Sequence, residues 1–120
     1  MKYKFLYFAL FAGLIFSNSL SAKDYEWEGN TSTEWNDPTN WDLDDGTFPD
    51  VATDHVTIIP GAPNNPVTNE VVTIGTLTIN NLGILTISTG ITTGSVLINT
   101  GGSLTINAST TLDIDGNIDI

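Results

Sequence analysis

Acidic side chains are the main groups that could do chemistry in this 120-residue chain, which has fourteen of them against three lysines and no arginine. Three of them fall in Asp42-Leu43-Asp44-Asp45-Gly46, and carboxylate oxygens are the ligands that Ca²⁺ prefers. The glycine comes one residue early for an EF-hand, and Thr53 stands where that loop carries a bidentate glutamate. Asp42, Asp44 and Asp45 are therefore candidate Ca²⁺ ligands, with solvated loop acids as the ordinary alternative, and no other cofactor is expected.

A second acidic group could serve glycoside hydrolysis, because pairs of carboxylates carry that reaction. It consists of Asp113, Asp115 and Asp119, two of which lie between apolar residues and should face outward from a strand. Lyase chemistry would need a lysine or arginine base, and Lys23 is the only lysine beyond the first four residues. His55, the one histidine, has no serine or cysteine constellation near it. We predict no catalytic residue.

Three tryptophans could contact carbohydrate. Trp27, Trp35 and Trp41 present flat aromatic surfaces of the kind that stack on sugar rings. Large aromatic side chains can equally close the open end of a stack of smaller residues. The choice between these two interpretations depends on which structural elements carry the three tryptophans.

The first 22 residues have the features of a secretory signal peptide. Two lysines precede the apolar run 5–16, and small residues follow it. This run is roughly 12 residues long, whereas a membrane-spanning helix needs about 20, so no membrane insertion is expected after leader removal. Ser19 and Ser21 favour cleavage before Ala22, and cleavage after Ala22 is the alternative. The chain is thus predicted to be secreted or displayed at the cell surface.

The exported chain would be strongly acidic. Removal of the leader leaves one lysine, Lys23, against all fourteen acids. Nucleic acid and anionic membrane surfaces are therefore excluded as partners, because both need a basic footprint. There is no cysteine, so an exported domain must depend on its core and on backbone ladders rather than on disulfides.

A 19-residue unit repeats in the second half of the chain. Residues 71–89 are followed by a similar segment at 90–108, and the stretch 71–112 contains no charged residue. A fixed period near 20 residues is typical of stacked coils. Within each unit, apolar and polar residues alternate with period two, which predicts short strands with one buried face. We predict an all-β fold, a right-handed parallel β-helix with three short strands per coil of about 19 residues.

Two details of the repeat bear on how the coils would stack. Asn80 and Asn99 coincide, which fits either an asparagine ladder at a turn or two left-handed turn residues. Leu112-Asp113-Ile114 and Ile118-Asp119-Ile120 start a third coil two or three residues out of register.

The region before the repeat is different in kind. Residues 23–70 hold eleven of the fourteen acids, all three tryptophans and all five prolines. The end of a β-solenoid needs a cover for its open edge and apolar side chains. We therefore predict an acidic, tryptophan-rich N-terminal cap and turn-rich link at 23–70, and coils at 71–120 that are truncated at the C-terminus.

One series of residues resembles a known group of proteins. It comprises Trp27-x-Gly29, Trp35, Asn40-Trp41, Pro49 and Asp54-x-Val56-x-Ile58-x-Pro60, followed by Leu-x-Ile coils. This order resembles the start of secreted parallel β-helix proteins on the surfaces of Bacteroidota, which are mostly adhesin-like. A second resemblance, to the G8-type β-strand module of extracellular proteins, rests on the same order. The first implies an N-terminal fragment of a repetitive protein whose further coils lead to a sorting domain.

These observations predict a function without catalysis in this segment. We expect an exported structural or adhesive cell-surface β-solenoid, with carbohydrate, surface proteins and further coils of its own parent chain as partners. Threonine repeats can also match an ice lattice, but Ser95-Val96-Leu97 interrupts the pattern, and threonine suits exposed strand positions in any case. The alternative is the N-terminal part of a polysaccharide-degrading β-helix enzyme, a lyase or glycosidase with catalytic coils beyond residue 120.

Overall fold

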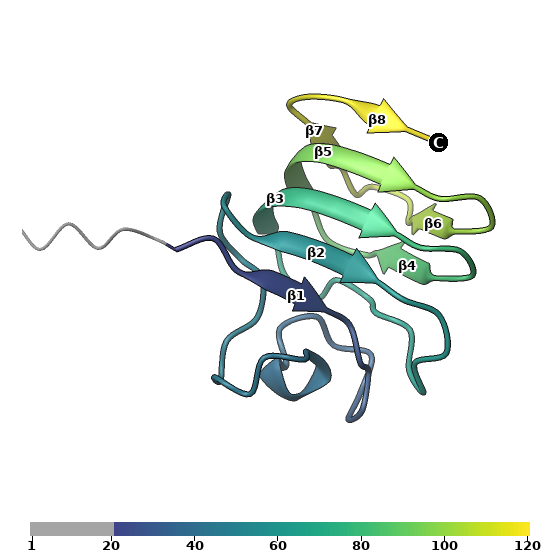
Figure 1. The fold of residues 1–120 in the computed structure, drawn as a ribbon. Coiled ribbons are helices and arrows are strands. Elements are labelled where there is room, and N and C mark those ends of the chain that lie inside the picture. Colours follow the sequence, from purple (N-terminus) through teal and green to yellow (C-terminus); the bar gives the residue numbers. More distant parts are fainter. Residues whose placement is uncertain (1–20) are drawn as a thin grey trace, which may run out of the picture.

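The computed structural model describes residues 21–120, and the predicted leader lies almost wholly outside them. Within this range the chain is nearly all β and winds into a β-solenoid of stacked parallel strands (Figure 1). The elements in chain order are β1 (Asp24–Glu26), the 3₁₀ helix η1 (Pro38–Asn40), β2 (His55–Ile58), β3 (Val72–Ile79), β4 (Ile84–Ile87), β5 (Ile91–Ile98), β6 (Ser103–Ile106), β7 (Leu112–Ile114) and β8 (Ile118–Asp119).

The main sheet contains one strand from each successive turn of the chain. Its order is β1-β2-β3-β5-β7, with β8 also paired to β5, and every pairing is parallel. The register between β3 and β5 is the 19-residue repeat itself, since Val72 pairs with Ile91 and Ile79 with Ile98. The predicted parallel β-helix is confirmed, and its coils stack one repeat apart.

A second, smaller sheet runs along another side of the solenoid. β4 pairs with β6, and Leu85 lies directly beside Leu104. Single parallel bridges from Glu34 to Val67 and from Val67 to Thr86 extend this column toward the N-terminus. Residues of the region predicted to be a cap and a link therefore continue both sheets of the repeat.

Each repeat contains fewer separate strands than the alternation suggested. The first two predicted strands of a unit run together into one eight-residue strand, β3 or β5. A glycine lies in the middle of each strand, where the strand passes close to the backbone of the preceding coil. A Cβ atom on Gly75 would lie 2.8 Å from the carbonyl oxygen of Ala52, and a Cβ atom on Gly94 would lie 2.7 Å from the carbonyl oxygen of Gly75. Only glycine allows this approach without a shift of backbone.

The third coil is offset as expected. β7 pairs Leu112 with Ile91, a separation of 21 residues, and β8 pairs Ile118 with Val96, a separation of 22. The prediction of a shift of two or three residues relative to the 19-residue unit is confirmed.

The core is a set of side-chain columns along the solenoid axis. One column passes through Val56, Leu77 and Val96, which are in register across β2, β3 and β5 and at most 2% exposed. At the N-terminal end the column continues with Tyr25 on β1. Burial of such columns is possible only when neighbouring coils are present, since each coil covers the next.

Three indole rings fill the N-terminal end of this core. The ring of Trp41 meets those of Trp27 and Trp35 edge to face, with centroids 4.9 and 4.8 Å apart, and Tyr25 packs on Trp41 at 5.8 Å. Each indole N–H donates to a backbone carbonyl: Trp27 to Asn64, Trp35 to Pro49 and Trp41 to Trp35. These bonds connect the loops around η1 to the stack.

The two asparagines of the repeat form a ladder. Asn99 Nδ2 donates to Asn80 Oδ1 at 2.9 Å, and Asn107 Nδ2 donates to Ser88 Oγ at 2.7 Å in the same coil-to-coil sense. Of the two interpretations left open by the sequence, the side-chain ladder holds. The left-handed conformation at this turn belongs instead to Leu82.

Candidate functional site

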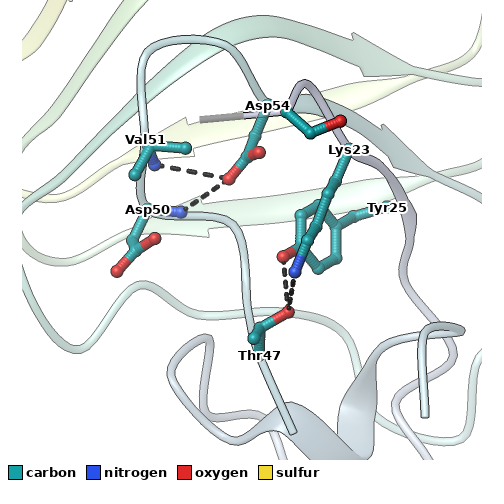
Figure 2. Close-up of a pocket in the computed structure, with 7 residues that line it drawn as sticks. Lys23, Tyr25, Thr47, Asp50, Val51 and Asp54 are labelled. Atoms are coloured by element: carbon teal, nitrogen blue, oxygen red, sulfur yellow. Dashed lines mark hydrogen bonds between the residues drawn. The ribbon is translucent and has the colours of Figure 1, made fainter. Parts of the chain in front are cut away.

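A pocket lies beside the first strands, between β1 and the loop that leads into β2 (Figure 2). Its volume is about 330 Å³, and its wall is formed by Ser21, Lys23, Tyr25, Thr47, Asp50, Val51 and Asp54. The period-two alternation explains the wall: Lys23 precedes buried Tyr25 by two residues, and Asp54 precedes buried Val56 by two. We call this cavity the Asp54 pocket.

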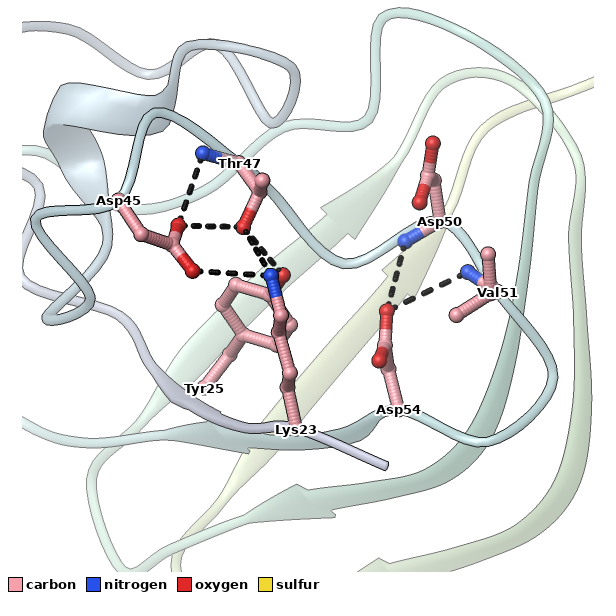
Figure 3. A network of polar contacts seen from close by, with 7 residues as sticks. All are labelled: Lys23, Tyr25, Asp45, Thr47, Asp50, Val51 and Asp54. Carbon is pink, nitrogen blue, oxygen red and sulfur yellow. Dashed lines mark hydrogen bonds and ion pairs between the residues drawn. The ribbon is translucent and has the colours of Figure 1, made fainter. Parts of the chain in front are cut away.

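One side of the Asp54 pocket is a closed polar network (Figure 3). Lys23 Nζ donates to Asp45 Oδ2 at 2.8 Å and to Thr47 Oγ1 at 3.1 Å. The hydroxyls of Tyr25 and Thr47 are 2.7 Å apart, and the backbone N–H of Thr47 donates to Asp45 Oδ1. The hydrogen bond from Lys23, followed by that from Thr47, lowers the pKa of Asp45 to about 2.

The other side of the pocket carries a carboxylate that is only half satisfied. Asp54 is 1% exposed, and its Oδ2 accepts from the backbone N–H groups of Asp50 and Val51 at 3.2 and 3.3 Å. Its Oδ1 is buried and has no hydrogen-bond partner among the described residues. Buried polar oxygens are almost always paired, so this atom marks a place where a donor fits.

The second carboxyl group of the pocket, that of Asp50, also lacks a compensating positive charge. Partial burial, then the nearby carboxylates of Asp54 and Glu70, raises the pKa of Asp50, against a smaller opposing effect of Lys23. The lysine cannot compensate fully because its ammonium already binds Asp45. The pocket thus has an anionic wall suited to a small cation.

The predicted Ca²⁺ ligands are not gathered into one site. Asp42 Oδ1 accepts from the backbone N–H of Glu26 at 2.7 Å, and Asp45 is engaged by Lys23 and Thr47. Asp44 lines a separate, smaller pocket of about 180 Å³ beside η1. Across residues 21–120 no group of three or more His, Cys, Asp or Glu side chains could hold a metal ion.

The tryptophans offer no ring face to a sugar in this arrangement. Trp27 and Trp35 are fully buried, and Trp41 is 1% exposed. All three pack on one another and bond to backbone carbonyls, as described above. Their observed environment is that of a closing cluster, which was the alternative to carbohydrate contact.

The remaining candidates lie on outer faces. Asp113 and Asp119 are exposed strand residues on β7 and β8, and Asp115 is exposed between them. His55 is exposed at the start of β2, and its Nδ1 lies 2.8 Å from Thr76 Oγ1 of the next coil. None of these four residues lines the Asp54 pocket.

Sequence reasoning did not single out Asp50 as a site residue, named Asp54 as part of the Asp54-x-Val56-x-Ile58 series, and so missed the pocket. One signal could have found it: Asp54, Val56 and Ile58 alternate with outward residues, which places the carboxylate on the buried face of the strand. Nothing in the sequence indicates that the loop containing Thr47 folds back to form the opposite wall.

Comparison with known proteins adds no relative. The chain matches no protein family, and no curated protein and no solved structure is significantly similar to it. The fold therefore defines the class, a small parallel β-solenoid, and nothing narrower. No helix in the described part of the chain is long and apolar enough to cross a membrane.

Proposed function

We propose that this chain is an exported structural and adhesive β-solenoid segment of a cell surface, of the kind that the Bacteroidota adhesin-like resemblance implies. The observation that supports it best is the outward face of the main sheet. In-register stacking lines up Thr76 with Ser95 and Thr73 with Thr92, without any charge between residues 71 and 112. On β3 and β5 this face carries repeated hydroxyl groups and no charge, and the acids of β1, β7 and β8 lie at its two edges.

A face of this kind suits multivalent contact better than catalysis. Hydroxyl groups repeated at the spacing of about 4.8 Å between strands can each donate and accept a hydrogen bond. Weak contacts add up when many identical groups bind one extended ligand, such as a polysaccharide chain. The acidic N-terminal region would keep the exported protein soluble and away from anionic surfaces.

The test is an adhesion assay with the exported chain immobilised on beads. We expect retention of beads on surfaces coated with neutral polysaccharides, and loss of at least half of it when Thr76→Lys and Thr78→Lys are combined. Both side chains point outward from β3 and are half-buried, so the fold should be retained. Circular dichroism and melting temperature check this.

The matched control combines Asn81→Lys with Thr100→Lys, which adds the same two charges at exposed turns outside the strands. This variant should adhere like the unmodified chain. Equal adhesion of the sheet-face variant and the control would contradict an adhesive role for the sheet face. Release of reducing ends, or of unsaturated sugars, from the same polysaccharides would instead support the enzyme alternative.

A further inference from the structure

We propose that the Asp54 pocket is an ammonium-binding site, and that its occupant is the α-ammonium group created at Ala22 when the leader is removed. The inference rests on the proposed export, because only a processed chain has an amino group at this position. It assigns the new N-terminus a place inside the N-terminal end of the solenoid.

The site is built around a buried oxygen that lacks a donor. Asp54 Oδ1 belongs to a side chain that is 1% exposed, faces the cavity and has no partner among residues 21–120. The other oxygen is held by two backbone N–H groups, so the carboxylate is fixed in orientation (Figure 2). A cation that donates hydrogen bonds would satisfy Oδ1 and offset the charge.

The start of the exported chain lies at the same place. β1 and β2 pair in parallel with Asp24 opposite His55, which places Lys23 opposite Asp54 in the register. The backbone N–H of His55 fixes this end by donating to the Lys23 carbonyl at 2.8 Å. Ser21 is itself part of the cavity wall, so the Ser21–Ala22 bond lies at the pocket.

Leader removal changes the chemistry of that bond. A leader peptidase hydrolyses the Ser21–Ala22 amide: the C–N bond breaks, water supplies a hydroxyl to the Ser21 carbonyl carbon, and Ala22 keeps the amine. At neutral pH the amine takes up a proton and becomes a cation with three donors. Ser21 leaves with the leader, so its part of the cavity becomes free for the ammonium group.

Other cations fit the pocket less well. Lys23 Nζ already binds Asp45 and Thr47. A Ca²⁺ ion takes six to eight oxygen ligands, whereas the pocket offers two carboxyl groups, one of which already accepts two backbone hydrogen bonds. The titratable groups around the cavity are Lys23, Tyr25, Asp45, Asp50 and Asp54, with Glu70 near Asp50. A tethered ammonium group needs few ligands and carries no cost of bimolecular association.

The experiment measures the reactivity of the α-amino group in the chain that begins at Ala22. Acylation with a limiting reagent at about pH 8 modifies the unprotonated amine, whose ordinary pKa is about 7.7 to 8.0. We expect the folded chain to react at least roughly tenfold more slowly than the same chain unfolded in urea, because ion pairing keeps the amine protonated. Asp54→Asn should abolish most of this protection, and Asp44→Asn, an exposed acid outside the pocket, should leave it unchanged.

Equal rates in the folded and unfolded chains would overturn the proposal, as would full protection in a folded Asp54→Asn variant. If that variant does not fold, a nitrogen-15 NMR titration of Ala22 in the unmodified chain decides instead: an ordinary midpoint contradicts the site, and a raised midpoint supports it. A chain that retains Ser21 moves the amine by one residue and should lose protection. N-terminal sequencing of the secreted product tests the export separately, and a chain released at Ala22 from a fusion keeps the ammonium test independent of it.

Discussion

Lys23 connects three parts of the chain at the N-terminal end of the fold through its side chain and its backbone. Its ammonium group bridges Asp45 and Thr47, while its backbone carbonyl accepts from His55 on the next strand. The side-chain contact links β1 to the loop around Gly46, and the backbone contact continues the parallel ladder. The Lys23–Asp45 ion pair is exposed and contributes little to stability, but it is the main cause of the low pKa of Asp45.

Replacement of Lys23 by glutamine should raise the pKa of Asp45 from about 2 toward its ordinary value, because the lysine is the largest cause of the depression. A depressed pKa in the folded state means that any stabilisation by Asp45 is present above its ordinary pKa of 3.8 and is lost as the pH falls through about 2. Carbon-13 NMR titration of the carboxyl groups measures the change. An unaltered Asp45 midpoint in the variant would show that the ion pair does not form in solution.

Asn99 tests the side-chain ladder. Asn99→Ala removes the donor to Asn80 Oδ1 and should lower the free energy of unfolding by about 1 kcal/mol. Asn81→Ala is the matched control, since Asn81 is exposed next to Asn80 at the corresponding turn of the preceding coil, and its effect should be within about 0.5 kcal/mol. Denaturant titration compares the two variants, and equal destabilisation would argue against a ladder.

At the scale of the elements, the bend within each long strand depends on glycine. Gly94 passes so close to the preceding coil that a Cβ would lie 2.7 Å from the carbonyl oxygen of Gly75. Gly90, at the corner before β5, has no atom closer than 3.6 Å to such a Cβ. Comparison of the two positions therefore distinguishes a glycine that close backbone approach requires, Gly94, from a glycine that only occupies a turn, Gly90.

Gly94→Ala should destabilise the fold by roughly 1 to 3 kcal/mol, because the added methyl group must push two coils apart. Gly90→Ala should be close to neutral, since its methyl group has space. Thermal melting of both variants, followed by circular dichroism, measures the difference. A Gly94→Ala variant as stable as Gly90→Ala would mean that the coils are not this closely stacked.

The tryptophan cluster is the second element-level feature that can be tested. Trp41→Phe keeps an aromatic ring but removes the N–H that donates to the Trp35 carbonyl at 2.8 Å. The buried carbonyl loses its partner, which should cost roughly 1 to 3 kcal/mol in the free energy of unfolding. Denaturant unfolding followed by the emission of the two remaining tryptophans gives the value. An unchanged midpoint would contradict the packing of this end.

The repeat could be predicted in detail because period and alternation are local signals. Leu85 and Leu104 share a position in the 19-residue unit, and the structure pairs them directly. The same reasoning missed that β3 is one bent strand, since Gly75 looks like a turn residue in a single sequence. Thr73 and Thr78 lie on one continuous strand, and the pairing of β3 with β5 resumes in the same register after Gly75.

The N-terminal region was harder to predict because its coils are interrupted. Residues of β1 and β2 continue the columns of the repeat, but about 28 residues separate the two strands instead of a short turn. The Asp54 pocket forms where this long connection returns to the stack. Contacts such as that of Tyr25 with Thr47 depend on long-range folding and leave no periodic trace in the sequence.

For the molecule as a whole, stability and proposed function rest on the same property. Coils that cannot fold singly bury their aliphatic side chains against one another, and the outward residues then fall into straight rows. Leu97, Ile106 and Ile118 remain partly exposed on the outer face or in the last turns, at 39, 47 and 52%. Such apolar positions and an open strand edge favour contact with further coils, which stays a prediction.

The most direct test of the account is whether residues 19 apart are neighbours in solution. Strands of adjacent coils are about 4.8 Å apart, so methyl groups of Leu85 and Leu104 should give a strong nuclear Overhauser effect in methyl-labelled protein. The same spectra should show one between Leu77 and Val96. Absence of both contacts in the folded chain, or a contact of Leu85 with a residue off this register, would contradict the stacked solenoid and the function proposed from it.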